Sequence, residues 1–214
     1  MSRYSFILAT FVLFAFANLQ AQTPVTGDEV VPHFAQVAPG IYRGGTPELS
    51  NGVAYLHEQG IKTIINLQGA DLVLKYSASE RSDSRNKEGE AAVQLGMKYF
   101  NLAIPAAADF SDADKENMGR AVRIMSSPEF QPVYVHCKLG NDRTGVVIGL
   151  YRILFQDWTA KQSNDEMTEN GHRGLRGFFT PYLSPFLFRI SDEKDFALKG
   201  KPVEDQSFFD ALKN

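Results

Sequence analysis

The sequence predicts an α/β fold in which a central, mostly parallel sheet is flanked by helices. Two short runs of β-branched and apolar residues, Ile61–Leu67 and Val133–His136, each follow a helical stretch instead of a tight hairpin turn. Strands that alternate with helices favour parallel pairing, because parallel neighbours need a long crossover connection. The segment Thr144–Phe155 is apolar on almost every side, which is typical of a helix buried between other elements.

The first half of the chain alternates strands with helices. Gly60 is expected to cap a helix, because glycine readily adopts the left-handed conformation that ends one, and Gly96 ends the next helical stretch. Between them, residues 69–87 are polar and mixed in charge, and we expect a surface loop or a short helix there. The elements expected in this half are strands at 41–43, 61–67 and 97–102, and helices at 48–59 and about 88–95.

The second half carries a clear helix start. Ser111 followed by Asp114 resembles a capping box, so a helix is expected to begin at Asp112. The aromatic stretch 178–188 contains two prolines and is interpreted as core packing or a short helical cover. The elements expected in this half are a loop at 104–110, a strand at 133–136, and helices at 112–125, 144–155 and about 159–169.

The N-terminus has the outline of a secretory signal peptide. Arg3 precedes an apolar stretch of about a dozen residues, which is shorter than the roughly twenty that span a bilayer, and a small-residue exit ends at Ala21. We therefore expect a periplasmic or secreted protein. The expected organisation is a signal peptide at 1–21, a lead-in at 22–33, one catalytic or binding domain at 34–196 and a C-terminal tail at 197–214.

Composition limits the classes of partner. The formal charge of −3 argues against nucleic acid as a partner and against a stable association with an anionic membrane, since either requires a basic excess. Cys137 is the single cysteine, so it cannot form an intramolecular disulfide. The sequence contains no cluster of His, Asp and Glu with the spacing of metal ligands, and we expect neither a metal nor a cofactor.

Residues 136–145, HCKLGNDRTG, lie between the expected strand and the buried helix. Successive backbone N–H groups in such a turn converge on an anion, and the positive end of the helix dipole points to the same place. These surroundings favour the thiolate of Cys137, and Arg143 offers two parallel donors to phosphoryl oxygens. The residues expected to hold the phosphate group, or the loop around it, are His136, Lys138, Leu139, Gly140, Asn141 and Thr144.

This motif resembles the HCxxGxxR(S/T)G signature of the protein tyrosine phosphatase superfamily. Among its branches it is most similar to compact dual-specificity-like enzymes and to phytase-like and phosphoinositide-directed members, and GIYRGGTPEL with GIKTIINL resembles the start of small bacterial members. The resemblance implies the cysteine-phosphatase fold, a phosphocysteine intermediate on Cys137, transition-state binding by Arg143 and no metal. We expect Thr144 to donate its hydroxyl to the sulfur, and His136 to brace the loop.

Two aspartates compete for the role of general acid. The resemblance implies an aspartate on a loop about thirty residues before the cysteine, where Asp109 lies; Asp112 and Asp114 fall in the first turn of a helix, where carboxylates are favourable anyway. Asp142 directly precedes Arg143, as in some inositol-lipid phosphatases. It is the second candidate, and it could instead orient Arg143 or the attacking water.

The charge beside the nucleophile bears on the substrate. Lys138 adds a cation at the mouth of the loop, as in members that act on phosphorylated inositols. The expected substrate is therefore a phosphorylated small molecule, an inositol polyphosphate, with a phosphotyrosine or mixed phosphoprotein as the alternative. A phosphate-binding pseudophosphatase without turnover is the hypothesis of a different class. Further cations that would form a basic rim if they folded toward the loop are Arg43, Lys62, Lys75, Arg81, Arg85 and Lys87.

Overall fold

A computed structural model of the chain describes residues 27–49, 51–69, 78–105, 110–172, 183–198 and 212. Its centre is a sheet of five strands in the order β1-β2-β5-β3-β4. The strands are β1 (Ala35–Ala38), β2 (Ile41–Gly44), β3 (Thr63–Gln68), β4 (Lys98–Ile104) and β5 (Val133–His136). Only β1 and β2 pair antiparallel, so the predicted mostly parallel sheet is confirmed, with β5 in its middle.

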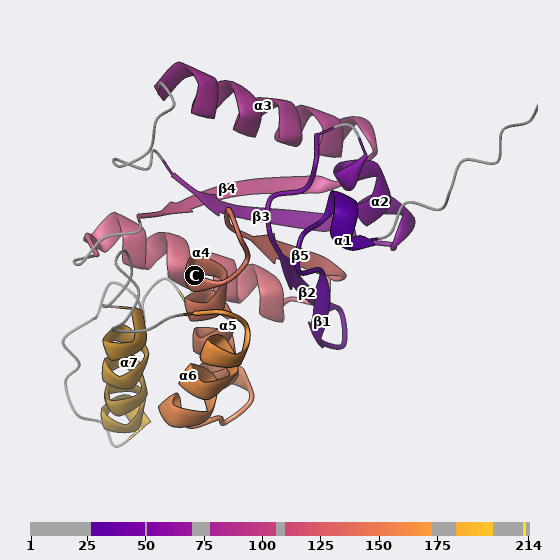
Figure 1. Cartoon of the computed structure of the whole chain (residues 1–214). Helices are drawn as coiled ribbons and strands as arrows, with labels where there is room; N and C mark the ends of the chain where they lie inside the picture. Colours follow the sequence, from indigo (N-terminus) through magenta and orange to yellow (C-terminus); the bar gives the residue numbers. More distant parts are fainter. Residues whose placement is uncertain are drawn as a thin grey trace, which may run out of the picture.

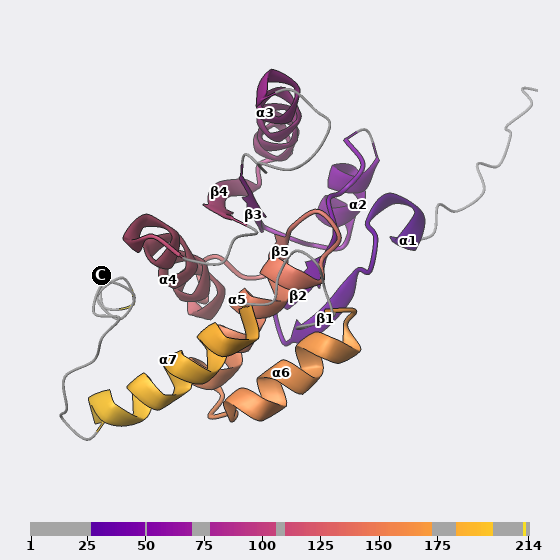
Figure 2. The ribbon, with the colours of Figure 1, turned by 60° about the vertical axis from the view of Figure 1, so that its left-hand side comes forward.

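Helices cover both faces of this sheet (Figures 1 and 2). One face carries α1 (Gly27–Val30), α2 (Gly52–Glu58) and α3 (Ala78–Gln94). The other face carries α4 (Asp112–Ser126), α5 (Asp142–Phe155), α6 (Ala160–Glu169) and α7 (Leu183–Leu198). Helix α5 contacts β5, α4, α6 and α7, which explains why its sequence is apolar on nearly all sides.

Two hydrophobic clusters form, one on each face, because successive side chains of a strand point to opposite sides. In β5, Val133 and Val135 belong to the cluster under α4 and α5, whereas Tyr134 belongs to the cluster under α2 and α3. The first cluster continues to Cys137, directly after the strand. The same alternation aims His136 at α3, which becomes important for the site.

Three elements differ from the sequence expectations. Helix α3 begins at Ala78 instead of near Glu88. Its sequence did not predict a helix of this length, because the buried positions include Glu88 and Ala92 and do not form a repeating apolar pattern. Helix α2 begins at Gly52, since the backbone N–H of Glu48 donates to the carbonyl of Val30 across the chain. Strand β1 was not expected at all.

At the ends of the domain, the structure adds two details. Val30 and Val31 are buried in the α2–α3 cluster, so the packed unit includes residues before position 34. Helix α7 contains Pro185 in its first turn, where a backbone N–H would have no partner within the helix in any case.

Within the described ranges, no helix combines the length and the apolar character that crossing a bilayer requires. The expected signal peptide, residues 1–21, lies outside those ranges.

Candidate active site

The loop Cys137–Asn141 leaves the carboxyl end of the central strand β5 and leads directly into α5. Ligands of open parallel sheets bind at this edge, and the first turn of α5 presents backbone N–H groups that have no partner within the helix. Cys137 itself is 3% exposed. The predicted strand, loop and helix arrangement is therefore confirmed, with α5 beginning two residues earlier than expected, at Asp142.

Gly140 allows the loop to bend against the neighbouring strand. Its φ of +79° is in the left-handed region that favours glycine. A Cβ at this position would lie 2.5 Å from both the carbonyl carbon and the oxygen of Gly44, and 2.9 Å from the nitrogen of Gly45. All three contacts are with backbone atoms, which cannot move aside as a flexible side chain can. The loop and the turn after β2 therefore touch directly.

The turn after β2 also holds the loop by hydrogen bonds. The backbone N–H of Thr46 donates to the Lys138 carbonyl at 3.1 Å, and the Thr46 hydroxyl donates to the Cys137 carbonyl at 3.3 Å. His33 Nδ1 donates to the Leu139 carbonyl at 2.9 Å. With these carbonyls engaged by donors outside the loop, the loop can present its N–H groups to an anion.

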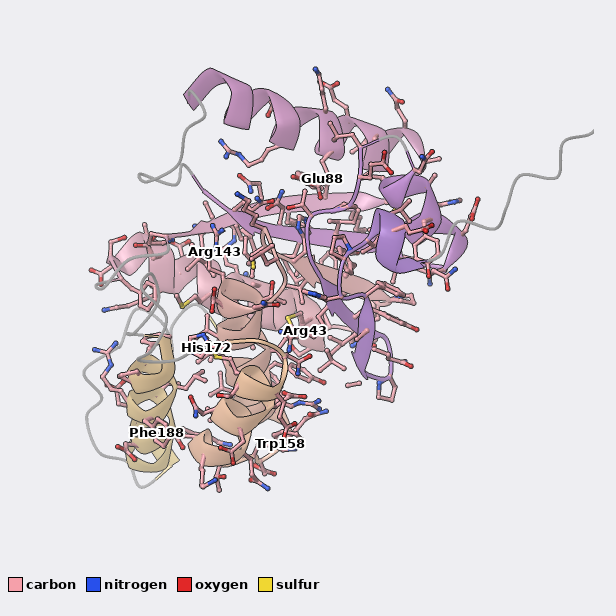
Figure 3. The ribbon with its side chains drawn as sticks, in the orientation of Figure 1. Arg43, Glu88, Arg143, Trp158, His172 and Phe188 are labelled. Carbon is pink, nitrogen blue, oxygen red and sulfur yellow. The ribbon has the colours of Figure 1, made fainter. Side chains whose placement is uncertain are left out.

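The Arg43 side chain is buried and donates a hydrogen bond to the loop, so it is not one of the exposed cations of a basic rim. This side chain on β2 is 3% exposed, and its Nη2 donates to the Gly140 carbonyl at 2.6 Å (Figure 3). Burial lowers the pKa of the Arg43 guanidinium, an effect opposed by Glu166 and by Cys137. The expectation of a rim cation at Arg43 is wrong, because strand alternation turns the side chain toward α5 and α6.

The other expected rim cations differ in where they lie relative to the loop. Lys62 precedes β3 and lies at the amino ends of the parallel strands, the edge of the sheet opposite Cys137. Arg85 Nη1 donates to the Gly69 carbonyl at 3.2 Å. Lys75 and the Arg81 side chain lie outside the described residues. Lys138, directly after Cys137, is exposed beside an exposed Leu139.

His136 braces the loop, as expected, through a buried network. Its Nδ1 lies 3.2 Å from the Cys137 carbonyl oxygen, and its Nε2 lies 2.7 Å from Oε1 of Glu88 on α3. Asn66 Nδ2 donates to the other oxygen of Glu88 at 2.8 Å, and to the Tyr99 hydroxyl at 3.1 Å. His136 and Glu88 are 0% and 2% exposed, so this carboxylate is a deeply buried part of the site.

Arg143 and Thr144 occupy the first turn of α5 and are both buried. Arg143 Nη1 donates to the carbonyl of Ile104, the last residue of β4, at 3.5 Å. The Thr144 hydroxyl has no hydrogen-bond partner among the described residues, and the expected bond to the sulfur is not formed in this structure. A buried hydroxyl without a partner at the N-terminus of a helix is suited to an anion held by the loop.

Asp142 and Asn141 join the loop to the end of α6. Asp142 Oδ1 lies 2.6 Å from Nδ1 of the buried His172. The Asn141 amide nitrogen, in the orientation that satisfies its neighbours, donates to the carbonyls of Asn170 and Leu139 at 3.1 and 3.0 Å. Asp142 thus lies beside Arg143 but its carboxylate already has a partner. Asp109, the first candidate for the acid, lies outside the described residues.

Sequence reasoning missed the groups that hold the loop from a distance, namely Arg43 in this role, Thr46, Glu88 and His172. Glu88 is one acid among many in a polar stretch, and no local signal separates it from its exposed neighbours. His172 follows Asn170 and Gly171 after a helix, a pattern that is typical of an ordinary turn. Of the described residues, no three His, Cys, Asp or Glu side chains are grouped so that they could hold a metal ion.

Known proteins resemble this chain in sequence and in fold. Curated relatives include the dual specificity protein phosphatase TpbA of Pseudomonas aeruginosa, 27% identical, and the inositol diphosphatase DSP4 of Arabidopsis thaliana, 30% identical. The matches cover 74% and 65% of this chain and 65% of each relative, so the chain spans less than two thirds of either protein.

Solved structures with the same fold include the core catalytic domain of the Saccharomyces cerevisiae PP-IP phosphatase SIW14, with a TM-score of 0.56 and 23% identity over 78% of this chain and 91% of that one. The structure of P. aeruginosa TpbA has a TM-score of 0.54 and 23% identity over 85% of this chain and 91% of that one. A profile of the tyrosine phosphatase family matches residues 30–199. With that match over most of its length, the chain belongs to the tyrosine phosphatase family.

Proposed function

We propose that this chain hydrolyses phosphate monoesters through a phosphocysteine intermediate on Cys137. The observation that carries the proposal is the convergence of three features at the carboxyl end of β5: the thiol, the Arg143 guanidinium and the N-terminus of α5. The names of the relatives, which are phosphatases, support it.

The first step forms a bond between the Cys137 sulfur and phosphorus and breaks the bond between phosphorus and the ester oxygen. The leaving oxygen takes a proton from a carboxylic acid, which contributes a rate factor of about a hundred to ten thousand. In the second step, a water oxygen attacks phosphorus and the P–S bond breaks. The resulting carboxylate takes the proton of that water, and the thiolate is restored. Arg143 and the loop N–H groups balance the charge of the phosphoryl oxygens in both steps.

We infer that Asp109 supplies the acid. The chain leaves β4 at Ile104, whose carbonyl already bonds to Arg143, and five extended residues span at most about 18 Å. This upper limit allows Asp109 to reach the phosphoryl group. Asp142 is less suited, because its carboxylate is already engaged by His172 at 2.6 Å.

Two sets of variants test the chemistry. Cys137→Ser is expected to abolish hydrolysis of an aryl phosphate while phosphate still raises the melting temperature; a fully active serine variant would refute the mechanism. Asp109→Asn is expected to lose far more activity on an alkyl phosphate, which needs a protonated leaving group, than on an aryl ester with a good leaving group. If Asp142→Asn shows that difference instead, Asp142 is the acid.

We propose inositol polyphosphates as the substrate class, with phosphotyrosine proteins as the alternative. Lys138, exposed beside the nucleophile, offers a cation to a second phosphate group that a single phosphotyrosine lacks. The relatives DSP4 and SIW14 are named inositol diphosphatases. The alternative is supported by TpbA, which is named a dual specificity phosphatase and whose structure is known in complex with phosphotyrosine.

A substrate panel separates these classes. Phosphate release is measured from inositol hexakisphosphate, from a diphosphoinositol phosphate and from a phosphotyrosine peptide, with wild type, Lys138→Ala and Lys62→Ala. Lys138→Ala is expected to reduce kcat/KM for the inositol phosphates about tenfold and for the peptide much less. Lys62→Ala, at the opposite edge of the sheet, is the control. Turnover of the peptide alone would favour the alternative, and phosphate binding without any turnover would identify a pseudophosphatase.

We also propose that residues 1–21 direct export, which would place the enzyme in the periplasm or outside the cell. The support is the charged start, the short apolar stretch and the exit at Ala21. Mass spectrometry of the protein from a secretion-competent bacterial host is expected to find a mature N-terminus at Gln22. Intact chain in the cytoplasmic fraction would contradict the proposal.

A further inference from the structure

The turn that follows α6 reaches back to the start of α5. This turn, residues 170–172, is called the α6 turn below, and each of its backbone N–H groups donates to a carbonyl of α6, so the turn is fixed to the end of that helix. A Cβ on Gly171 would lie 2.8 Å from Nδ2 of Asn141. The side chain of His172 is 0% exposed and lies on the side of the sheet that carries α5 (Figure 3). The α6 turn therefore packs directly against the end of the loop.

The α6 turn binds the two side chains that stand at the N-terminus of α5. Oδ1 of Asp142, the first residue of α5, lies 2.6 Å from Nδ1 of His172. The amide of Asn141, in the orientation that satisfies its neighbours, donates to the carbonyls of Asn170 and Leu139 at 3.1 and 3.0 Å. The contact with His172 holds the Asp142 side chain in place whichever of the two atoms carries the proton.

Side chains of these two types ordinarily close the N-terminus of a helix. Asparagine is among the most favoured N-cap residues, because its oxygen accepts from a first-turn N–H, and an acidic side chain in the first turn is attracted to the same groups. Ser111 and Thr159, which precede α4 and α6, are extended and accept in this way. Asn141 is instead in the helical conformation, and in the described part of the chain its side chain makes no capping bond.

We propose that His172 is a positioning residue that keeps the N-terminus of α5 open for the phosphoryl group, by holding the Asp142 side chain away from the first-turn N–H groups. The proposal rests on the proposed function, in which these N–H groups bind the phosphoryl oxygens. The buried Thr144 hydroxyl, which has no hydrogen-bond partner among the described residues, agrees with a first turn that is kept open.

The effect on the enzyme follows from competition for the same donors. A side chain that caps α5 and a phosphate group both need the free N–H groups of the first turn. Any population of a capped form therefore lowers the phosphate affinity by the fraction of the protein that is still open. Without His172, the carboxyl group of Asp142 is released next to these donors, and the capped form becomes populated.

The test is the dissociation constant for inorganic phosphate, measured by titration calorimetry in wild type, His172→Leu, Asp142→Ala and the double variant. His172→Leu releases the Asp142 side chain and is expected to weaken phosphate binding about fivefold, the effect of one typical capping interaction. Asp142→Ala removes the competing side chain, so it is expected to bind phosphate within about twofold of wild type. The double variant is expected to recover the affinity that His172→Leu loses.

Turnover of an aryl phosphate gives a second readout. A capped form only reduces the fraction of competent enzyme, so His172→Leu is expected to raise KM about fivefold and to leave kcat unchanged. Thr159→Ala is the control, because it removes the capping box at the opposite end of α6 and weakens that helix without changing a residue that contacts the loop. It is expected to bind phosphate as wild type does.

Wild-type phosphate affinity in His172→Leu would overturn the proposal. So would a double variant that binds as weakly as His172→Leu, because truncating Asp142 cannot repair a merely structural defect in the α6 turn. Asp142→Ala tests the same point without altering the buried turn, and a large loss of phosphate affinity in it would also overturn the proposal. If wild type itself does not bind phosphate, the proposed function fails and this proposal fails with it, a result distinct from any difference among the variants.

Discussion

Gly140→Ala tests how tightly the loop is built against β2. Gly140 has a φ of +79°, and a residue with a Cβ costs roughly 1–2 kcal/mol in that conformation. In addition, the new Cβ would lie 2.5 Å from the Gly44 backbone, about 1 Å closer than a normal carbon contact. Overpacking of this kind costs about 1–3 kcal/mol. The expected total loss of unfolding free energy is about 2–5 kcal/mol.

Gly60→Ala is a matched control for this change. Gly60 has the same φ of +79°, but a Cβ there would meet no atom within 4 Å. It therefore carries the conformational cost of about 1–2 kcal/mol and no overlap. The difference between the two variants isolates the contact between the loop and the turn after β2.

Urea denaturation, followed by the fluorescence of the single tryptophan Trp158, gives both free energies. Turnover of an aryl phosphate by the folded protein gives the second readout. Relief of the overlap must shift the loop, and a shift of about 1 Å in a catalytic group costs about a hundredfold in rate. Gly140→Ala is expected to lose about that much activity, while Gly60→Ala retains full activity. Equal destabilisation of the two variants, or full activity of Gly140→Ala, would refute this account of the loop.

Three further predictions concern the surroundings of the loop. Arg43→Lys leaves the Gly140 carbonyl without its planar donor and is expected to cost about 1–3 kcal/mol, with turnover reduced at least about tenfold; unchanged turnover would contradict a supporting role. Arg152→Met breaks the 2.6 Å ion pair with Glu166 and is expected to cost about 3 kcal/mol in urea denaturation, with turnover of the folded protein nearly unchanged. Burial raises the pKa of Tyr99, so above about pH 10 the unfolded chain releases a proton that the folded chain keeps. The free energy of unfolding should therefore fall by up to about 1.4 kcal/mol per pH unit above that pH. Tyr99→Phe should make that decline shallower.

The fold was predictable where the local sequence and the tertiary environment agree. The strand at 133–136 and the helix after it have no polar side, and burial on both faces requires that pattern. The helix at 112–126 was predictable from its start, because Ser111 and Asp114 form the expected capping box. Helix α3 was not, since its buried face is made of Glu88 and Ala92, and a carboxylate that is buried through hydrogen bonds looks like a surface acid in sequence.

The site divides in the same way. The placement of Cys137, Gly140 and Arg143 was predictable because one short motif contains the proposed nucleophile, the bend and the proposed anion donor together. The role of Arg43 was not, because a cation near the start of the domain looks like surface charge until strand pairing places β2 beside β5. Glu88 contacts His136 and His172 contacts Asp142, the two residues that flank the loop, from 48 and 30 residues away along the chain. Such contacts depend on how the strands and helices are arranged, and the motif alone does not indicate that arrangement.

This division also indicates where substrate preference can change without loss of chemistry. The backbone of Lys138 and Leu139 is fixed, because Thr46 and His33 donate to their carbonyls, while both side chains are exposed. Substituting either side chain alters what an approaching substrate meets and leaves the hydrogen bonds that shape the loop in place. Cys137, by contrast, is buried, and the groups that surround it are held from β2 and α3. Specificity is therefore expected to reside at positions 138 and 139, and catalysis in the contacts made behind the loop.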